Sequence, residues 1–157
     1  MNGRVIGLDY GSRTVGVSVT DALGITVQPF ETITRKEENK LRRTCARVEE
    51  IIKELGVKEI VVGLPLHLDG EESESSVKAR AFGEMLARRT GLPVCYQDER
   101  LTTVEADGIL GDTGVPKGER KQYIDAVAAC LILEDYLSRK AHEKAAGEEE
   151  RTESHGK

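Results

Sequence analysis

The order of the patterned segments limits what this chain can fold into. Three strand patterns come first, over residues 3–9, 14–20 and 25–33, and the second places valines at every other position, as in a strand with one buried face. The short connections between these segments favour antiparallel pairing. We therefore expect an antiparallel meander of three strands, in which Pro29 indicates an edge position or an irregularity.

Helical and strand patterns alternate after residue 34. An apolar stripe with steps of three and four residues runs from Leu41 to Leu55. Thr34 and Glu37 before it have the spacing of a capping box, and Gly56 after it is a natural helix stop. The later elements are expected to be a strand over 57–62, a helix over 75–90, a strand ending at Glu99, a short helix over 102–110, a loop over 111–118 and a helix over 121–138.

This order predicts an α/β fold. Three antiparallel strands and two strands reached by helical crossovers would form a mixed five-stranded sheet, with helices on both faces. If the first strand is central, ligands should gather beyond the ends of the strands at one edge of the sheet. Apolar residues almost vanish from Arg139 onward. We therefore expect one domain over residues 1–138 and a disordered charged tail over residues 139–157.

Composition excludes several classes of protein. A chain of 157 residues can bury a core of its own without disulfides or a structural metal. No segment approaches the roughly 20 apolar residues of a membrane span. The amino-terminal residues lead directly into a strand pattern and leave no room for a signal peptide, so a cytoplasmic protein is expected. The three cysteines are far apart on apolar faces, which indicates buried reduced thiols.

The charge is unevenly distributed. The net charge of −5 argues against a general polyanion binder, yet between Arg35 and Arg47 six basic side chains outweigh two acidic ones. A patch of this kind could contact phosphates. For this segment taken alone, a solvated helix face is the preferred interpretation.

Three carboxylates lie where expected elements begin or end. Asp9 and Glu99 each close an apolar strand pattern, and Asp125 opens the most apolar helix pattern. A carboxylate beside apolar neighbours is costly to desolvate unless a base or a cation pairs with it. Three together would hold Mg²⁺ or Mn²⁺, because these hard cations prefer oxygen ligands. Simpler explanations remain for each: a turn residue, a surface ion pair and a partner of the helix dipole.

The neighbours of these carboxylates suggest contacts with phosphate. Gly11 would allow a tight turn after the first strand, and Arg13 could neutralise a phosphate through its planar fork. Strand alternation sends Asp98 and Glu99 to opposite faces, so only one of them can point towards Asp9. Arg100 could pair with either of these two carboxylates.

Four motifs in order carry a resemblance to a known family. They are Asp9-Tyr10-Gly11 with Arg13 and Gly16, then Gly63-Leu64-Pro65 with Asp69-Gly70, then residues 98–103, and then Ile124-Asp125 before Ala128-Ala129 and Ile132-Leu133. From about Arg4 to Leu137 the chain resembles the YqgF/RuvX family of Holliday-junction resolvases and pre-16S ribosomal RNA nucleases. The resemblance implies an RNase H-like fold and hydrolysis of phosphodiester bonds with one or two Mg²⁺ or Mn²⁺ ions, held by Asp9, Glu99 and Asp125.

The candidate substrate contacts are Arg13, His67, Arg100 and Lys121. His67 stands where the family commonly has asparagine, in the loop before Asp69-Gly70, which leaves the carboxylates untouched but puts the contact from this loop in doubt. A solvent-exposed loop residue is the slightly preferred interpretation of His67.

The substrate itself is left open by the sequence. Processing of the 5′ end of pre-16S ribosomal RNA in ribosome biogenesis is the first choice, with assembly intermediates of the ribosome as partners. The alternative, resolution of branched DNA, would call for a homodimer with two active sites. A non-catalytic RNA-binding assembly factor is a third reading. The segment over residues 9–16 also resembles the phosphate hairpin of actin-like kinases, but 157 residues cannot supply their two domains.

Overall fold

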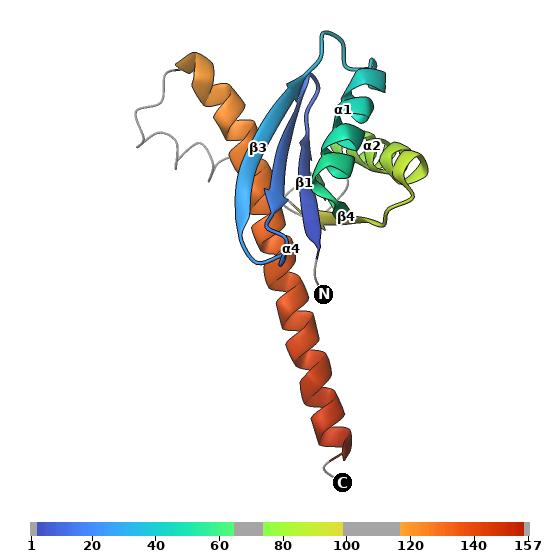
Figure 1. The fold of residues 1–157 in the computed structure, drawn as a ribbon, viewed down its shortest axis with the longest axis vertical. Coiled ribbons are helices and arrows are strands. Elements are labelled where there is room, and N and C mark those ends of the chain that lie inside the picture. The colour runs from blue at the N-terminus through green and yellow to red at the C-terminus, as the bar shows by residue number, and fades with distance from the viewer. Residues whose placement is uncertain (1–2, 65–73, 99–116, 156–157) are drawn as a thin grey trace.

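The computed structural model describes residues 3–64, 74–98 and 117–155 (Figure 1). The predicted helix over 102–110 and the predicted loop up to residue 116 lie outside these ranges. The elements in chain order are β1 (Arg4–Tyr10), β2 (Thr14–Thr20), β3 (Val27–Thr34), α1 (Arg42–Leu55), β4 (Val57–Leu64), α2 (Glu74–Thr90), β5 (Val94–Asp98) and α4 (Lys117–His155).

The strands form one mixed sheet in the order β3-β2-β1-β4-β5. β1 and β3 both pair antiparallel with β2, while β4 pairs parallel with β1 and β5 parallel with β4. The predicted meander and the central position of β1 are therefore confirmed. Pro29 lies on the edge strand β3, beside a shift in register between Val17 and Ser18, as its missing N–H requires.

Helices cover both faces of the sheet, as predicted. α1 and α2 pack on one face, where the main core gathers Ile6 and Leu8 of β1 and the three alternating valines of β2. α4 runs along the other face, against β1, β2 and β3 (Figure 1). Burying side chains as completely as Val15, Val17 and Val19, all 0% exposed, stabilises a fold by roughly 1.5–3 kcal/mol for each one.

The ends of the helices differ in part from the prediction. The capping box of Thr34 and Glu37 is wrong: Thr34 still belongs to β3, α1 begins at Arg42, and its N-cap residue Leu41 makes no side-chain capping bond. Gly56 ends α1 as predicted, with a left-handed φ of 68° that glycine adopts without strain.

α4 is longer than predicted. It begins at Lys117, within the predicted loop, and continues to His155, so residues 139–155 are helical rather than irregular. The side chains from Ser138 to Ala145 are nevertheless exposed and add nothing to the core. The division into a domain over 1–138 and a tail over 139–157 stays a prediction. Among the described residues, no helix combines the length and the apolar character that crossing a membrane requires.

The cysteines are free thiols, as predicted. Cys45 and Cys130 are buried, and Cys95 is half-buried. Burial raises the pKa of the Cys130 thiol to about 12. This thiol is therefore protonated at neutral pH and packs as a small apolar side chain.

Candidate active site

Asp9 lies one residue before the end of the central strand β1, on the face that α4 covers. A side-chain carbon placed on Gly7 would meet Leu133 of α4, so Gly7 faces this helix. Successive residues of a strand point to opposite faces, and Asp9 therefore shares the face of Gly7. Its cross-strand neighbour in the antiparallel pair with β2 is Gly16. Neighbours of this kind have Cα atoms about 4.5–5.5 Å apart.

Gly16 brings Asp125 to the same place. A side-chain carbon at Gly16 would overlap the backbone carbonyl of Asp125 and would lie 3.0 Å from the backbone nitrogen of Ala126. The backbone of α4 at Asp125 therefore rests directly on Gly16, opposite Asp9. One oxygen of the Asp125 carboxylate, Oδ2, is buried from solvent. The fold thus gathers Asp9 and Asp125, far apart in the sequence, on the two sides of one glycine.

Small residues of the sheet continue this close packing along α4. Gly7 leaves room for Leu133, and the hydroxyl of Ser18 donates a hydrogen bond of 2.8 Å to the carbonyl of Ala129. The alanines of α4 allow the same approach from the helix side, as the sequence predicted. These contacts position the helix on the sheet and so determine where Asp125 lies.

Of the carboxylates at the end of β5, one is described. Asp98 is the last residue of this strand and pairs with Leu64. Tyr96, two residues earlier, packs against Gly83 of α2, so Asp98 also points to the face of α1 and α2, away from the face of Asp9. Glu99 lies outside the described residues, and its place beside Asp9 and Asp125 stays a prediction.

The candidate substrate contacts are only partly described. Arg13 is exposed in the turn between β1 and β2. Lys121 belongs to the first part of α4, where only the backbone is described. His67 and Arg100 lie outside the described residues.

Arg35 fixes the turn that follows Asp9, a role that its sequence context did not reveal. Its Nη2 donates a hydrogen bond of 2.6 Å to the carbonyl of Gly11, and its Nε donates one of 3.0 Å to the carbonyl of Glu38. Its guanidinium lies 4.9 Å from the centre of the Tyr10 ring. Its backbone N–H donates to the carbonyl of Arg13 at 2.8 Å. One side chain thus joins the end of β1 to the segment before α1.

The donors gathered here suit a hard divalent cation. Asp9 and Asp125 supply carboxylate oxygens, which Mg²⁺ and Mn²⁺ prefer. Within the described ranges, no three acidic, histidine or cysteine side chains come together as a metal site. A complete site would therefore take a further ligand from elsewhere, and Glu99 is the predicted one.

The sheet order, the carboxylate at the end of the central strand and the helix that carries a second carboxylate across it define an RNase H-like domain. The solved structure of RuvC from Thermus thermophilus has the same fold. It matches 88% of this chain and 96% of its own, with a TM-score of 0.55 at 18% sequence identity. A second structure of that protein, titled as a complex with a Holliday junction substrate, matches with a TM-score of 0.54 at 20% identity.

The chain belongs to the RuvX family, whose model, described as Holliday junction resolvase, matches residues 3–139. A relative from Lachnospira eligens is 56% identical over 137 residues, which cover 87% of this chain and 98% of the relative. A relative from Agathobacter rectalis is 52% identical over 134 residues, covering 85% of this chain and 94% of the relative. Both carry the name "Putative pre-16S rRNA nuclease". The family predicted from the sequence motifs is confirmed.

Proposed function

We propose that this chain is a metal-dependent nuclease that hydrolyses phosphodiester bonds in structured nucleic acid, and that its substrate is the 5′ end of pre-16S ribosomal RNA. The family and the names of the relatives support the class of enzyme. The close packing of Asp125 on Gly16, opposite Asp9, is the structural observation that carries the proposal. The activity would belong to the cytoplasm, with ribosome-assembly intermediates as partners.

Asp9, Asp125 and Glu99 would hold Mg²⁺ or Mn²⁺. A divalent cation supplies Lewis-acid chemistry that activates water and stabilises the leaving oxygen. Asp9 is fixed by the pairing of β1 in the centre of the sheet, and Asp125 by the contact of its backbone with Gly16. Because Oδ2 of Asp125 is shielded from water, its attraction for a cation is screened less than at the surface.

Arg13 would contact a phosphate of the substrate. The backbone N–H of Gly11 donates a 2.7 Å hydrogen bond to the carbonyl of Thr14, so this amide serves to close the turn. The side chain of Arg13 is exposed and extends from the same turn. Its planar guanidinium suits a bidentate contact with phosphate.

A Holliday junction is the alternative substrate, because the family model carries that description. Resolution of a junction requires two cuts related by a two-fold axis, and therefore a homodimer. Cleavage of pre-16S ribosomal RNA makes no such demand. The two proposals differ in substrate and in the number of chains, whereas the proposed carboxylates are the same.

The first test replaces Asp9 by asparagine, which keeps the shape of the side chain and removes its charge. Asp9→Asn should fold normally and lose cleavage by a factor of at least about 10²–10³, the loss typical of removing one group that stabilises charge in the transition state. Cleavage would be measured with Mg²⁺, with Mn²⁺ and with a chelator, on RNA that spans the 5′ end of the 16S sequence and on a four-way DNA junction.

Asp98→Asn is the matched control. The substitution is the same and lies at the same edge of the sheet, but on the opposite face, so cleavage should persist. An Asp9→Asn protein that is folded and cleaves like the wild type would remove Asp9 from the site. Tight binding of the RNA by a wild-type protein that cuts neither substrate would favour a non-catalytic assembly factor.

A further inference from the structure

The basic segment between Arg35 and Arg47 divides into two groups in the structure. Three of its cations are engaged within the protein. Arg35 fixes the turn after β1, and Arg47 forms ion pairs of 2.6 Å with Glu31 and 3.0 Å with Glu50. Lys40 lies 3.7 Å from Glu37.

Four other cations are exposed and form no ion pair within the part of the chain that the structure describes. We call this group the basic rim; it consists of Arg13, Lys36, Arg42 and Arg43. Exposed cations of a folded protein keep their hydration and their full charge, so they are available for an anionic partner. Because the whole chain carries a net charge of −5, this group stands out as a local positive region.

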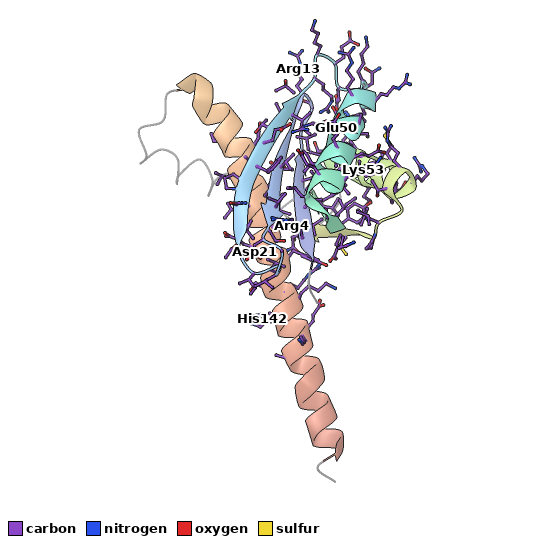
Figure 2. The ribbon with its side chains drawn as sticks, in the orientation of Figure 1. Arg4, Arg13, Asp21, Glu50, Lys53 and His142 are labelled. Atoms are coloured by element: carbon purple, nitrogen blue, oxygen red, sulfur yellow. The ribbon has the colours of Figure 1, made fainter. Side chains whose placement is uncertain are left out.

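The rim is continuous although its members come from three segments. Arg13 lies in the β1–β2 turn, and its carbonyl accepts a 2.8 Å hydrogen bond from the backbone of Arg35, the residue before Lys36. Arg42 and Arg43 open α1, which follows that segment. Figure 1 shows the β3–α1 segment and the start of α1 at the end of the molecule towards which β1 runs, and Figure 2 places Arg13 there too.

The rim also lies close to the proposed cleavage site. Asp9 is two residues before Gly11, whose carbonyl is held by Arg35. Basic side chains and the cleavage site therefore share one edge of the sheet, while the carboxylates face α4. A nucleic acid cut at Asp9 would pass the rim as it leaves the site.

We infer that the basic rim binds the sugar-phosphate backbone of a base-paired segment of the substrate, next to the bond that is cut. This inference rests on the proposed nuclease function and adds the form of nucleic acid that the enzyme holds. Four separate cations suit a regular row of phosphates, and arginine forks bind phosphate in pairs of hydrogen bonds.

The surface of the rim favours a duplex over an unpaired strand. Proteins that capture single strands stack bases on exposed aromatic rings. The chain has no tryptophan. Among the described residues, the ring nearest the rim is that of Tyr10, which packs against Phe82 and is covered by Arg35. Phosphates, rather than splayed bases, are what this surface can contact.

The test measures binding in the Asp9→Asn background, where cleavage cannot interfere. One variant replaces the four rim residues by glutamine. Its control replaces four exposed cations elsewhere that also form no ion pair in the described part of the chain; Figure 2 places one of them, Lys53, on α1 at a distance from Arg13. The control set is Lys53, Lys58, Arg88 and Lys144. Both variants change the net charge equally, so only the position of the charges differs.

The affinity for a short RNA duplex would be measured between about 50 and 200 mM salt, together with a single strand of the same sequence. Each lost phosphate contact lowers the slope of log affinity against log salt by about 0.9 for a duplex. The rim variant should therefore lower the slope by about three, and the control variant should lower it by much less. The parent protein should bind the duplex more tightly than the single strand.

Two outcomes would overturn the inference. Equal losses in the rim and control variants would mean that net charge alone acts, and tighter binding of the single strand would contradict the choice of a duplex. The nuclease proposal is decided separately, by the cleavage of the Asp9→Asn protein. In a protein with Asp9 intact, the rim variant should raise KM and leave kcat nearly unchanged, which separates substrate binding from damage to the site.

Discussion

At Gly16 the absence of a side chain allows α4 to lie directly on β2 and brings Asp125 opposite Asp9. We predict that Gly16→Ala lowers the free energy of unfolding by about 1–3 kcal/mol, because the added carbon meets backbone atoms of Asp125 and Ala126 that cannot rotate away. Cleavage should fall further than this loss explains, since a displacement near 1 Å at a reacting site costs on the order of 10² in rate. Urea unfolding and cleavage rates would measure the two effects.

Gly7→Ala is the control for this prediction. The added carbon would meet the Cγ of Leu133 at 2.5 Å and the hydroxyl of Ser18 at 2.6 Å, which are side-chain atoms beside a later part of α4. Stability should fall, but cleavage should fall less than in Gly16→Ala. If both variants lost cleavage equally, the contact at Gly16 would have no special part in positioning Asp125.

Sequence patterns identified Asp9 and Asp125 because a carboxylate next to an apolar run stands out. The same patterns contained Gly16, but not the fact that a helix more than a hundred residues later would rest on it, since close approach depends on tertiary packing. Arg35 looked like one more cation of a basic segment. Its role in fixing the turn after Asp9 depends on hydrogen bonds to backbone carbonyls, which composition does not indicate.

At the scale of elements, a buried polar cluster joins α4 to the far side of the sheet. The hydroxyl of Tyr136 on α4 donates a hydrogen bond to the carboxylate of Glu59 on β4. The thiol of Cys95 on β5 lies 3.3 Å from the same oxygen of Glu59. Burial, together with the hydrogen bond to Glu59, raises the pKa of the Tyr136 hydroxyl above its ordinary value of 10.0.

This cluster should make the stability of the fold depend on alkaline pH. Folded Tyr136 keeps its proton at pH values where the unfolded chain loses it, so its contribution is complete below about pH 10 and is lost as the pH rises further. Tyr136→Phe should therefore lower the free energy of unfolding at neutral pH by about 1–3 kcal/mol, since a buried carboxylate loses a donor. Above pH 10, the difference from the wild type should shrink.

Urea unfolding at several pH values would measure both effects. Tyr96→Phe is the control, because the Tyr96 hydroxyl donates only a 3.2 Å bond to the exposed carbonyl of Arg80. That variant should change stability at neutral pH by less than Tyr136→Phe. A Tyr136→Phe protein as stable as the wild type would mean that the cluster does not hold α4 in place.

The elements themselves were largely predictable, and their exact ends were not. Short connections imposed the meander, and apolar periodicity located α1, α2 and the parallel strands. The start of α1 was misplaced because Thr34 and Glu37 have capping-box spacing, yet Thr34 pairs with Thr14 in the sheet. Strand pairing satisfies the backbone of Thr34, so this residue is not available to begin a helix.

At the scale of the whole molecule, the last helix extends far beyond the sheet (Figure 1). Its buried residues end near Tyr136, and the side chains from Ser138 to Ala145 are exposed. The family model likewise ends at residue 139. The sequence signalled this boundary through the loss of apolar residues, but it could not show that the backbone remains helical, because helix formation there follows from an element that is already folded.

We therefore predict that the core and the nuclease site do not need residues 141–157. A chain that ends at Lys140 should unfold at nearly the same temperature as the full chain and cleave at the same rate. A chain that ends at Ser138 should be less stable by about 0.5–1 kcal/mol, the value of exposed cation–π contacts. Arg139 and Lys140 lie 5.5 and 5.6 Å from the centre of the Tyr136 ring.

A chain that ends at Ala129 provides the contrast for these truncations. It lacks Ile132, Leu133 and Tyr136, which are 1%, 0% and 2% exposed and form the core between α4 and the sheet. Losing several buried side chains exceeds the stability of an ordinary domain, so this chain should not fold. Thermal unfolding followed by circular dichroism would order the three truncations. A large loss of stability or of cleavage on ending the chain at Lys140 would show that the projecting part of α4 contacts the rest of the molecule or its substrate.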